Sequence, residues 1–100
     1  MENEIKMRVS DTGAKIWTLN GNYHREDGPA IEHHDGTKYW FFHGERHRLD
    51  GPAVMRSTGK TKWYINDYNV TEKITQWAEE NDIDLDNLSE VDKALIKLIW

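Results

Sequence analysis

The sequence of 100 residues contains no cysteine, which excludes disulfide bonds and thiolate chemistry and favours a reducing compartment. It also lacks an apolar run of about 18 residues, the length that a transmembrane helix requires, and it has no signal-like segment at its start. Its hydrophobic fraction is low, at 37%, and its length suits one domain with a modest core. We therefore expect a cytoplasmic protein that makes no contact with a membrane.

The common signatures of catalysis and cofactor binding are missing as well. There is no Gly-rich phosphate loop, no nucleophile elbow and no His or Cys spacing typical of zinc. Residues 82–86 carry the first three carboxylates of a calcium loop, but Asn87 and Lys93 stand where such a loop needs Gly and Glu. His33 and His34 are adjacent and would point to opposite faces of a strand. We expect no metal, no cofactor and no enzymatic activity.

Aromatic residues are plentiful, and three of the five tryptophans recur at a constant spacing of 23 residues: Trp17, Trp40 and Trp63. A glycine stands four positions before each of them: Gly13, Gly36 and Gly59. Between the copies runs a near-identical phrase, His-Arg-x-Asp-Gly-Pro-Ala, at residues 24–30 and 47–53. A fixed period in this range indicates a repeated supersecondary unit.

Each copy has the pattern of a β-hairpin. Asp35-Gly36 lies between two strand-like runs and suits a type I′ turn, which needs positive φ at both central positions. We expect hairpins over roughly residues 4–20, 29–43 and 52–66. The predicted fold class is α+β: an antiparallel meander of three repeated β-hairpins closed by two short C-terminal helices.

The outgoing hairpin arms alternate between two faces. One face carries the three tryptophans together with Leu19, Phe42 and Ile65, and we expect this apolar set to form the core. The other face is amphipathic and includes Tyr39, Phe41, His43 and Tyr64. Its aromatic side chains are candidates for a partly exposed surface.

The 23-residue period ends after residue 69, where a helical cap is expected over residues 70–100, behind a repeat region over residues 1–69. Thr71 is the predicted N-cap of a first helix that ends near Asn81. Ser89 and Asp92 resemble a capping box for a second helix. Its apolar stripe is expected to pack onto the sheet: Val91, Leu95, Leu98 and Ile99.

The repeated phrase combines an imidazole, a guanidinium and a carboxylate, so it has two interpretations. We favour a structural role, because such a device must recur in each copy, and Arg25 can pair with Asp27 or with Asp50 of the next copy. The alternative is an enzyme or metal protein that uses the paired residues of both copies: His24, Arg25, His47 and Arg48.

Charge is distributed unevenly along the chain. Up to Lys62 there are ten Lys/Arg and nine Asp/Glu, whereas from Trp63 onward there are three Lys and nine Asp/Glu. The repeat region is therefore near neutral and the cap strongly acidic. Binding of single-stranded nucleic acid through Lys38, Lys60, Lys62 and the surface aromatic residues is a further alternative, but a net charge of −5 disfavours it. Mimicry of nucleic acid by the acidic cap is another, for which nine acidic residues in 38 are a low density.

The phrases at 24–30 and 47–53, with their Gly, Lys and Trp arms, resemble the HRxDGPA repeats of tailed-phage and large-DNA-virus proteins, which are similar to MORN variants. The resemblance covers residues 13–69 and implies a chain of β-hairpins, often of viral source, with no enzymatic activity to carry over. The Tyr-x-Gly-x-Trp phrase of MORN proteins is absent, so lipid binding is not implied.

Taken together, these patterns predict a small non-enzymatic protein-binding module, encoded by a phage, that inhibits or modulates a host protein in the host cytoplasm. The scaffold would also allow a homo-oligomer. We expect the binding surface to combine the amphipathic sheet face with acidic residues of the cap: Tyr39, Phe41, His43, Tyr64, Glu79, Glu80, Asp82, Asp84 and Asp86.

Overall fold

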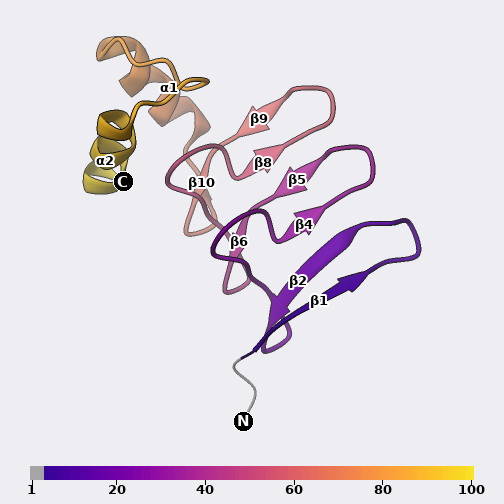
Figure 1. The fold of residues 1–100 in the computed structure, drawn as a ribbon. Coiled ribbons are helices and arrows are strands. Elements are labelled where there is room, and N and C mark those ends of the chain that lie inside the picture. The colour runs from indigo at the N-terminus through magenta and orange to yellow at the C-terminus, as the bar shows by residue number, and fades with distance from the viewer. Residues whose placement is uncertain (1–3) are drawn as a thin grey trace.

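The computed structural model describes residues 4–100 and contains antiparallel strands followed by two helices (Figure 1). This confirms the mixed α and β composition. The strands are β1 (Ile5–Val9), β2 (Lys15–Leu19), β3 (Asn22–Tyr23), β4 (Ile31–Glu32), β5 (Lys38–Tyr39), β6 (Phe41–Phe42), β7 (Glu45–Arg46), β8 (Val54–Met55), β9 (Thr61–Lys62), β10 (Tyr64–Ile65) and β11 (Tyr68–Asn69). The helices are α1 (Thr71–Glu80) and α2 (Glu90–Ile99). Neither helix is long and apolar enough to cross a membrane.

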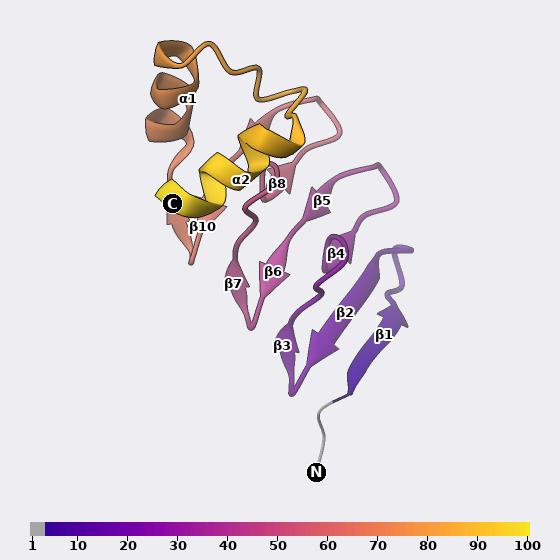
Figure 2. The same cartoon turned by 60° about the vertical axis from the view of Figure 1, so that its left-hand side comes forward.

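One large sheet runs the length of the strand region in the order β1-β2-β4-β5-β8-β9, with β3 paired to β2. Two small sheets, β6-β7 and β10-β11, lie beside it (Figure 2). All pairings are antiparallel. The strands stack in layers from β1 at one end to the helices at the other, so the two ends of the molecule differ.

The second and third outgoing arms are interrupted at their tryptophans, whereas the sequence predicts continuous strands. β5 ends at Tyr39 and β6 begins at Phe41, in a different sheet. The amide of Trp40 donates to the carbonyl of Ala53 in the following copy at 2.7 Å. Its carbonyl accepts from the amide of His47 at 3.2 Å. These bonds point the tryptophan backbone toward the next layer.

Trp17 makes the equivalent bonds, to Ala30 and His24, yet β2 continues through it because β1 pairs with all five of its residues. The later arms end before the tryptophan because β4 and β8 pair with them over two residues only.

The tryptophans are buried unequally, and the predicted core face is only partly correct. Trp63 is 3% exposed, whereas Trp17 and Trp40 are half-buried. Phe42, expected in the core, is 39% exposed, while Tyr64, expected at the surface, is buried. Alternation along a single strand does not apply across the break, because the residues after the tryptophan belong to a second sheet with its own neighbours.

Stacking between layers explains why Tyr64 is covered. The ring of Phe41 lies 5.1 Å from that of Tyr23 in the preceding copy. At the equivalent place one layer on, the guanidinium of Arg46 lies 4.1 Å from the centre of the Tyr64 ring. The residue after each of these tryptophans is therefore covered by the copy before it.

Helix α1 begins one residue earlier than the capping signal predicts. Val70, not Thr71, is the N-cap, and its side chain makes no capping bond. The hydroxyl of Thr71 accepts from the amide of Trp63 at 2.9 Å instead. In the earlier copies this bond is made by an alanine carbonyl, so Thr71 ends the strand array. The predicted C-terminal boundary at Asn81 is confirmed.

Helix α2 has the predicted capping box but the opposite orientation. Ser89 and Asp92 bond reciprocally at 3.0 Å, as expected. The side chain that α2 buries is Ile96, at 0% exposed. The predicted stripe faces outward, with exposed fractions of 68, 39, 83 and 53% for Val91, Leu95, Leu98 and Ile99.

A cluster around Trp63 accounts for this orientation. Trp63, Ile74 and Ile96 form its buried centre, and Trp100 packs against it from the end of α2. Ile96 and Trp100 lie four residues apart and share one side of the helix. Because an indole buries more apolar area than any aliphatic side chain, this side has more to gain from the core than the stripe has.

Candidate functional site

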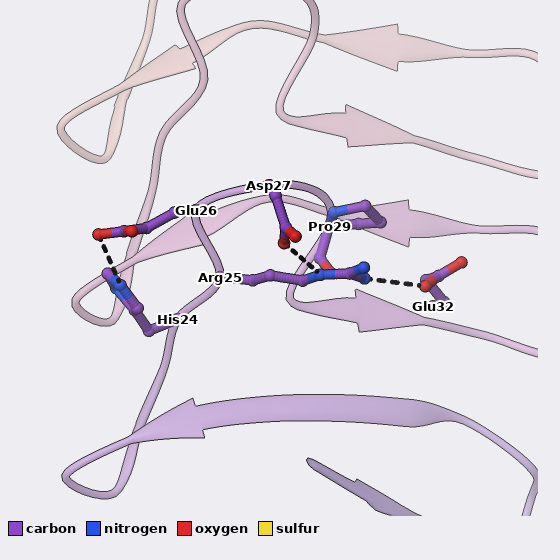
Figure 3. A network of polar contacts seen from close by, with 6 residues as sticks. All are labelled: His24, Arg25, Glu26, Asp27, Pro29 and Glu32. Carbon is purple, nitrogen blue, oxygen red and sulfur yellow. Dashed lines mark hydrogen bonds and ion pairs between the residues drawn. The ribbon is translucent and has the colours of Figure 1, made fainter. Parts of the chain in front are cut away.

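Each repeated phrase is organised around its arginine. The guanidinium of Arg25 lies 3.8 Å from the ring centre of Trp17. It donates to Asp27 at 3.0 Å, to the carbonyl of Pro29 at 3.1 Å and to Glu32 at 3.2 Å (Figure 3). The predicted Arg25–Asp27 pair is thus confirmed. A planar guanidinium can stack on a ring and bond in its own plane at once, which a lysine cannot do.

The second phrase repeats this arrangement. Arg48 lies 3.9 Å from the ring centre of Trp40 and donates to Asp50 at 2.8 Å and to the carbonyl of Pro52 at 3.1 Å. Burial raises the pKa of the Asp50 carboxyl, but the hydrogen bond and charge of Arg48 outweigh this effect and leave the pKa below its ordinary value. Both arginines are therefore engaged within the protein.

The glycines of the phrase make room for these arginines. A Cβ atom added to Gly51 would lie 2.5 Å from the guanidinium carbon of Arg48, and one added to Gly28 would lie 3.0 Å from that of Arg25. The sequence indicates these glycines as turn residues. The structure assigns them a second role, since each arginine is sandwiched between an indole ring and a bare glycine backbone.

The histidines of the phrase bind backbone in the next layer. The amide of His43 donates to Nδ1 of His24 at 2.9 Å, and the amide of Asn66 donates to Nδ1 of His47 at 3.0 Å. Both donors have positive φ, 50° and 49°. Each imidazole therefore stabilises the left-handed backbone conformation of a residue that lies 19 positions later in the sequence.

His24 is 1% exposed and its neutral form is favoured. Burial lowers its pKa from 6.5, and the charge of His43 lowers it further, while nearby Glu26 acts in the opposite direction. A neutral ring is what the bond to His43 requires, because a protonated imidazole has no acceptor nitrogen. Among residues 4–100, no group of three or more His, Asp or Glu side chains could hold a metal ion.

An open groove of about 640 Å³ separates the two phrases. Arg25 and Arg48 line it together with Trp40, Phe42 and His47. Because each arginine already contacts a tryptophan ring and an aspartate, the groove presents mainly aromatic side chains rather than a reactive group.

The predicted sheet surface is not assembled as expected. Tyr39 and Phe41 are half-buried and only His43 is exposed, while Tyr64 is buried with Ala53 and Val54. Tyr39 packs against the same cluster. These rings therefore serve the contacts between layers and do not form one exposed aromatic platform.

The predicted acidic residues are all exposed. Glu79 and Glu80 lie at the end of α1, and Asp82, Asp84 and Asp86 lie in the connector to α2. Within the connector, the carboxylate of Asp84 accepts from the amide of Asp86 at 2.9 Å. This part of the expected surface therefore projects into solvent.

The sequence pattern identified an apolar stripe on α2 but did not show that this stripe is exposed to solvent. We call Val91, Leu95, Leu98 and Ile99 the α2 apolar face. Their spacing identifies one side of a helix but does not say whether that side meets the sheet or the solvent. The only available signal was the competing pair Ile96 and Trp100 on another side of the same helix.

Comparisons with protein-family models, with curated proteins and with solved structures found no match to this chain.

Proposed function

We propose that this chain is a non-enzymatic protein-binding module that docks its partner on the α2 apolar face. The observation that carries the proposal is the exposure of four large aliphatic side chains on one helix of ten residues. A soluble domain rarely leaves such a contiguous patch uncovered unless it serves an interaction. The strands behind it, which we interpret as a meander of three repeated β-hairpins, would act as the scaffold.

The acidic surplus of the cap favours a basic amphipathic helix as the partner, although α2 itself carries two acidic residues and two lysines. From Trp63 onward the chain has nine acidic and three basic residues, and the acidic side chains at 79–86 are exposed. A partner helix with an apolar stripe and flanking Lys or Arg would bury the aliphatic side chains and be attracted by the carboxylates.

The resemblance of the repeats to those of phage and viral proteins suggests the biological setting. In that setting the chain would be phage-encoded and act in the host cytoplasm, where it would inhibit or redirect a host protein. Its rigid layers would present α2 in a fixed orientation, which lowers the entropic cost of binding.

Affinity capture from a bacterial lysate tests the proposal when matched variants are compared. Leu98→Ser removes the most exposed member of the face, at 83% exposed, and Tyr68→Ser removes an equally accessible side chain elsewhere, at 76%. We expect the Leu98 variant to lose the captured protein and the Tyr68 variant to retain it. Equal capture by both variants, or none by the native chain, would contradict the proposal.

The role of the acidic residues is tested on the same captured protein. Replacing Asp84 and Asp86 by Asn should weaken capture at low salt and flatten its dependence on salt, because screening acts only on the charge that was removed. An unchanged salt dependence would mean that the connector does not attract the partner.

A further inference from the structure

The edge of the large sheet at β1 is open. β1 is the first strand in the sheet order, and its five residues are all exposed. Figures 1 and 2 both show it at the end of the strand array opposite the helices. Among residues 4–100 no strand pairs with its outer side. An uncovered edge of this length is a template for another strand.

The register of β1 and β2 shows which backbone groups point outward. The amide of Ser10 donates to the carbonyl of Ala14 at 2.9 Å, which marks a hydrogen-bonded position. Met7 lies opposite Trp17, whose amide and carbonyl bond away from β1, to Ala30 and His24. Because such positions alternate in an antiparallel pair, the outward N–H and C=O groups belong to Ile5, Met7 and Val9.

The same three residues carry exposed apolar side chains. Ile5, Met7 and Val9 are 45, 52 and 59% exposed, and alternate residues of a strand share one face. The outer side of β1 therefore combines free backbone bonding groups with an apolar row.

We propose that β1 pairs with β1 of a second copy, antiparallel and about a two-fold axis at Met7. In this register Ile5 lies opposite Val9 of the partner subunit, so the outward groups of all three residues are paired. The apolar rows then meet on one face. If the two strands were shifted by two residues, one of the three apolar side chains on each strand would have no apolar side chain opposite it. The strand is therefore most complementary to a second copy of itself in the register centred on Met7.

The existing sheet uses the corresponding edge in its later copies. β4 meets β2 antiparallel, with Ile31 opposite Ile16, and β8 meets β5 with Val54 opposite Tyr39. β1 occupies the position in the first copy that β4 and β8 occupy in the later ones, 23 and 46 residues on. A second β1 would therefore occupy the edge that β4 and β8 already use for antiparallel pairing, where their partners β2 and β5 are outgoing arms.

The opposite face of this junction sets a limit on its strength. Lys6 would lie across from Arg8 of the partner subunit, and like charges opposite one another are destabilising. The pairing should therefore tighten as salt is added, in contrast to a contact driven by opposite charges. A single five-residue strand also buries little area, so we expect dissociation in the micromolar range.

Sedimentation velocity at protein concentrations from about 10 µM to about 1 mM covers the expected dissociation constant and tests the proposal. The native chain should reach twice the monomer mass. Met7→Pro removes only an outward N–H, since Met7 makes no bond to β2, and an edge strand tolerates such a proline. We expect this variant to remain monomeric with an unchanged circular dichroism spectrum. Met7→Lys, which keeps the backbone donor, should weaken pairing at least tenfold.

Arg8→Glu tests the register itself. The substitution places a carboxylate opposite Lys6 twice across the axis, so dimerisation should strengthen several-fold and no longer increase with salt. A native chain that is monomeric throughout, a Met7→Pro variant that still pairs, or an Arg8→Glu variant that pairs less tightly would each overturn the proposal. A mass above the dimer would overturn the two-fold arrangement.

Discussion

Single residues of the repeated phrase hold the layers together. Arg25 and Arg48 each bridge an indole ring, an aspartate and a proline carbonyl. The three groups lie at fixed distances along the sequence, eight residues before the arginine and two and four residues after it. This fixed spacing explains why the phrase recurs almost unchanged, since moving any one group would remove one of the partners of the guanidinium.

Substitution of Gly51 should reveal how much this arrangement stabilises the fold. In Gly51→Ala the new methyl group would displace the guanidinium of Arg48 from Trp40, because its Cβ would lie 2.5 Å from the guanidinium carbon. We expect a loss of about 1–2 kcal/mol in the free energy of unfolding, from one cation–π contact and weakened hydrogen bonds. Urea denaturation monitored by tryptophan fluorescence measures it.

A double-mutant cycle identifies the cause of that loss. In a chain that already carries Arg48→Ala, the added methyl group meets no guanidinium, so Gly51→Ala should then cost much less. An equal cost in both backgrounds would show that Gly51 matters for its backbone conformation and not for the space it leaves.

His24 should make stability dependent on pH. Its pKa in the folded protein lies below 6.5, chiefly through burial, so the unfolded chain binds more protons once the pH falls below that value. This contribution is complete above pH 6.5 and is lost as the pH falls through 6.5 toward the folded pKa. We expect the melting temperature of the native chain to decrease over that interval.

The variant His24→Gln removes the titrating ring and serves as the comparison. It should be less stable than the native chain at neutral pH, because the amide of His43 loses the ring nitrogen, but its melting temperature should depend less on pH. Parallel curves for the two proteins between pH 7.5 and 5, an interval of about the width that one shifted histidine affects, would contradict the role assigned to His24.

The elements show where sequence patterns are sufficient and where they are not. Local signals predicted the Ser89 capping box and the end of α1 at Asn81, where the bonding partners are neighbours in sequence. They did not predict the start of α1, because the hydroxyl of Thr71 bonds to the distant amide of Trp63. The orientation of α2 depends on Trp63, which lies more than 25 residues away and favours Ile96 and Trp100 over the aliphatic stripe. No periodicity within the helix contains that information.

The strands likewise have features that neighbouring residues determine and features that distant residues determine. The position of the turn at Asp35-Gly36 and the pairing of β4 with β5 around it were predictable from the dipeptide. The predicted type I′ turn is wrong, because Gly36 has positive φ but Asp35 does not. The break at Trp40 was not predictable, because it depends on how far the incoming arm pairs: β1 pairs with β2 on both sides of Trp17, whereas β4 pairs with β5 no further than Tyr39. The expected aromatic surface failed for that reason, since the break moves Tyr64 into a buried position between layers.

Two substitutions on α2 test its orientation directly. Ile96→Ala should cost about 2–4 kcal/mol in the free energy of unfolding, because it leaves a cavity beside Trp63 and Ile74. Leu98→Ala, on the α2 apolar face at 83% exposed, should change stability by less than about 0.5 kcal/mol. Thermal denaturation of both variants measures these losses in stability. A larger loss for Leu98→Ala than for Ile96→Ala would place the stripe in the core.

At the scale of the whole molecule, the two ends are stabilised differently. The C-terminal end is closed by α1 and α2 over the buried Trp63, whereas the N-terminal end is the exposed strand β1. Within residues 4–100 the core consists of small clusters, one around Ala53 and Val54 and one around Trp63, and no single centre spans the layers. In a layered array each unit is stabilised mainly by its neighbours, so opening need not be uniform.

Hydrogen exchange at the three equivalent tryptophan amides measures this gradient. The amides of Trp17 and Trp40 donate to Ala30 and Ala53, and that of Trp63 donates to Thr71 beneath the cap. Below the concentration at which β1 would pair, protection should be lowest at Trp17. Ile96→Ala removes packing only at the capped end, so protection should fall most at Trp63, less at Trp40 and least at Trp17. An equal loss at all three amides would mean that the layers unfold together, as one cooperative unit.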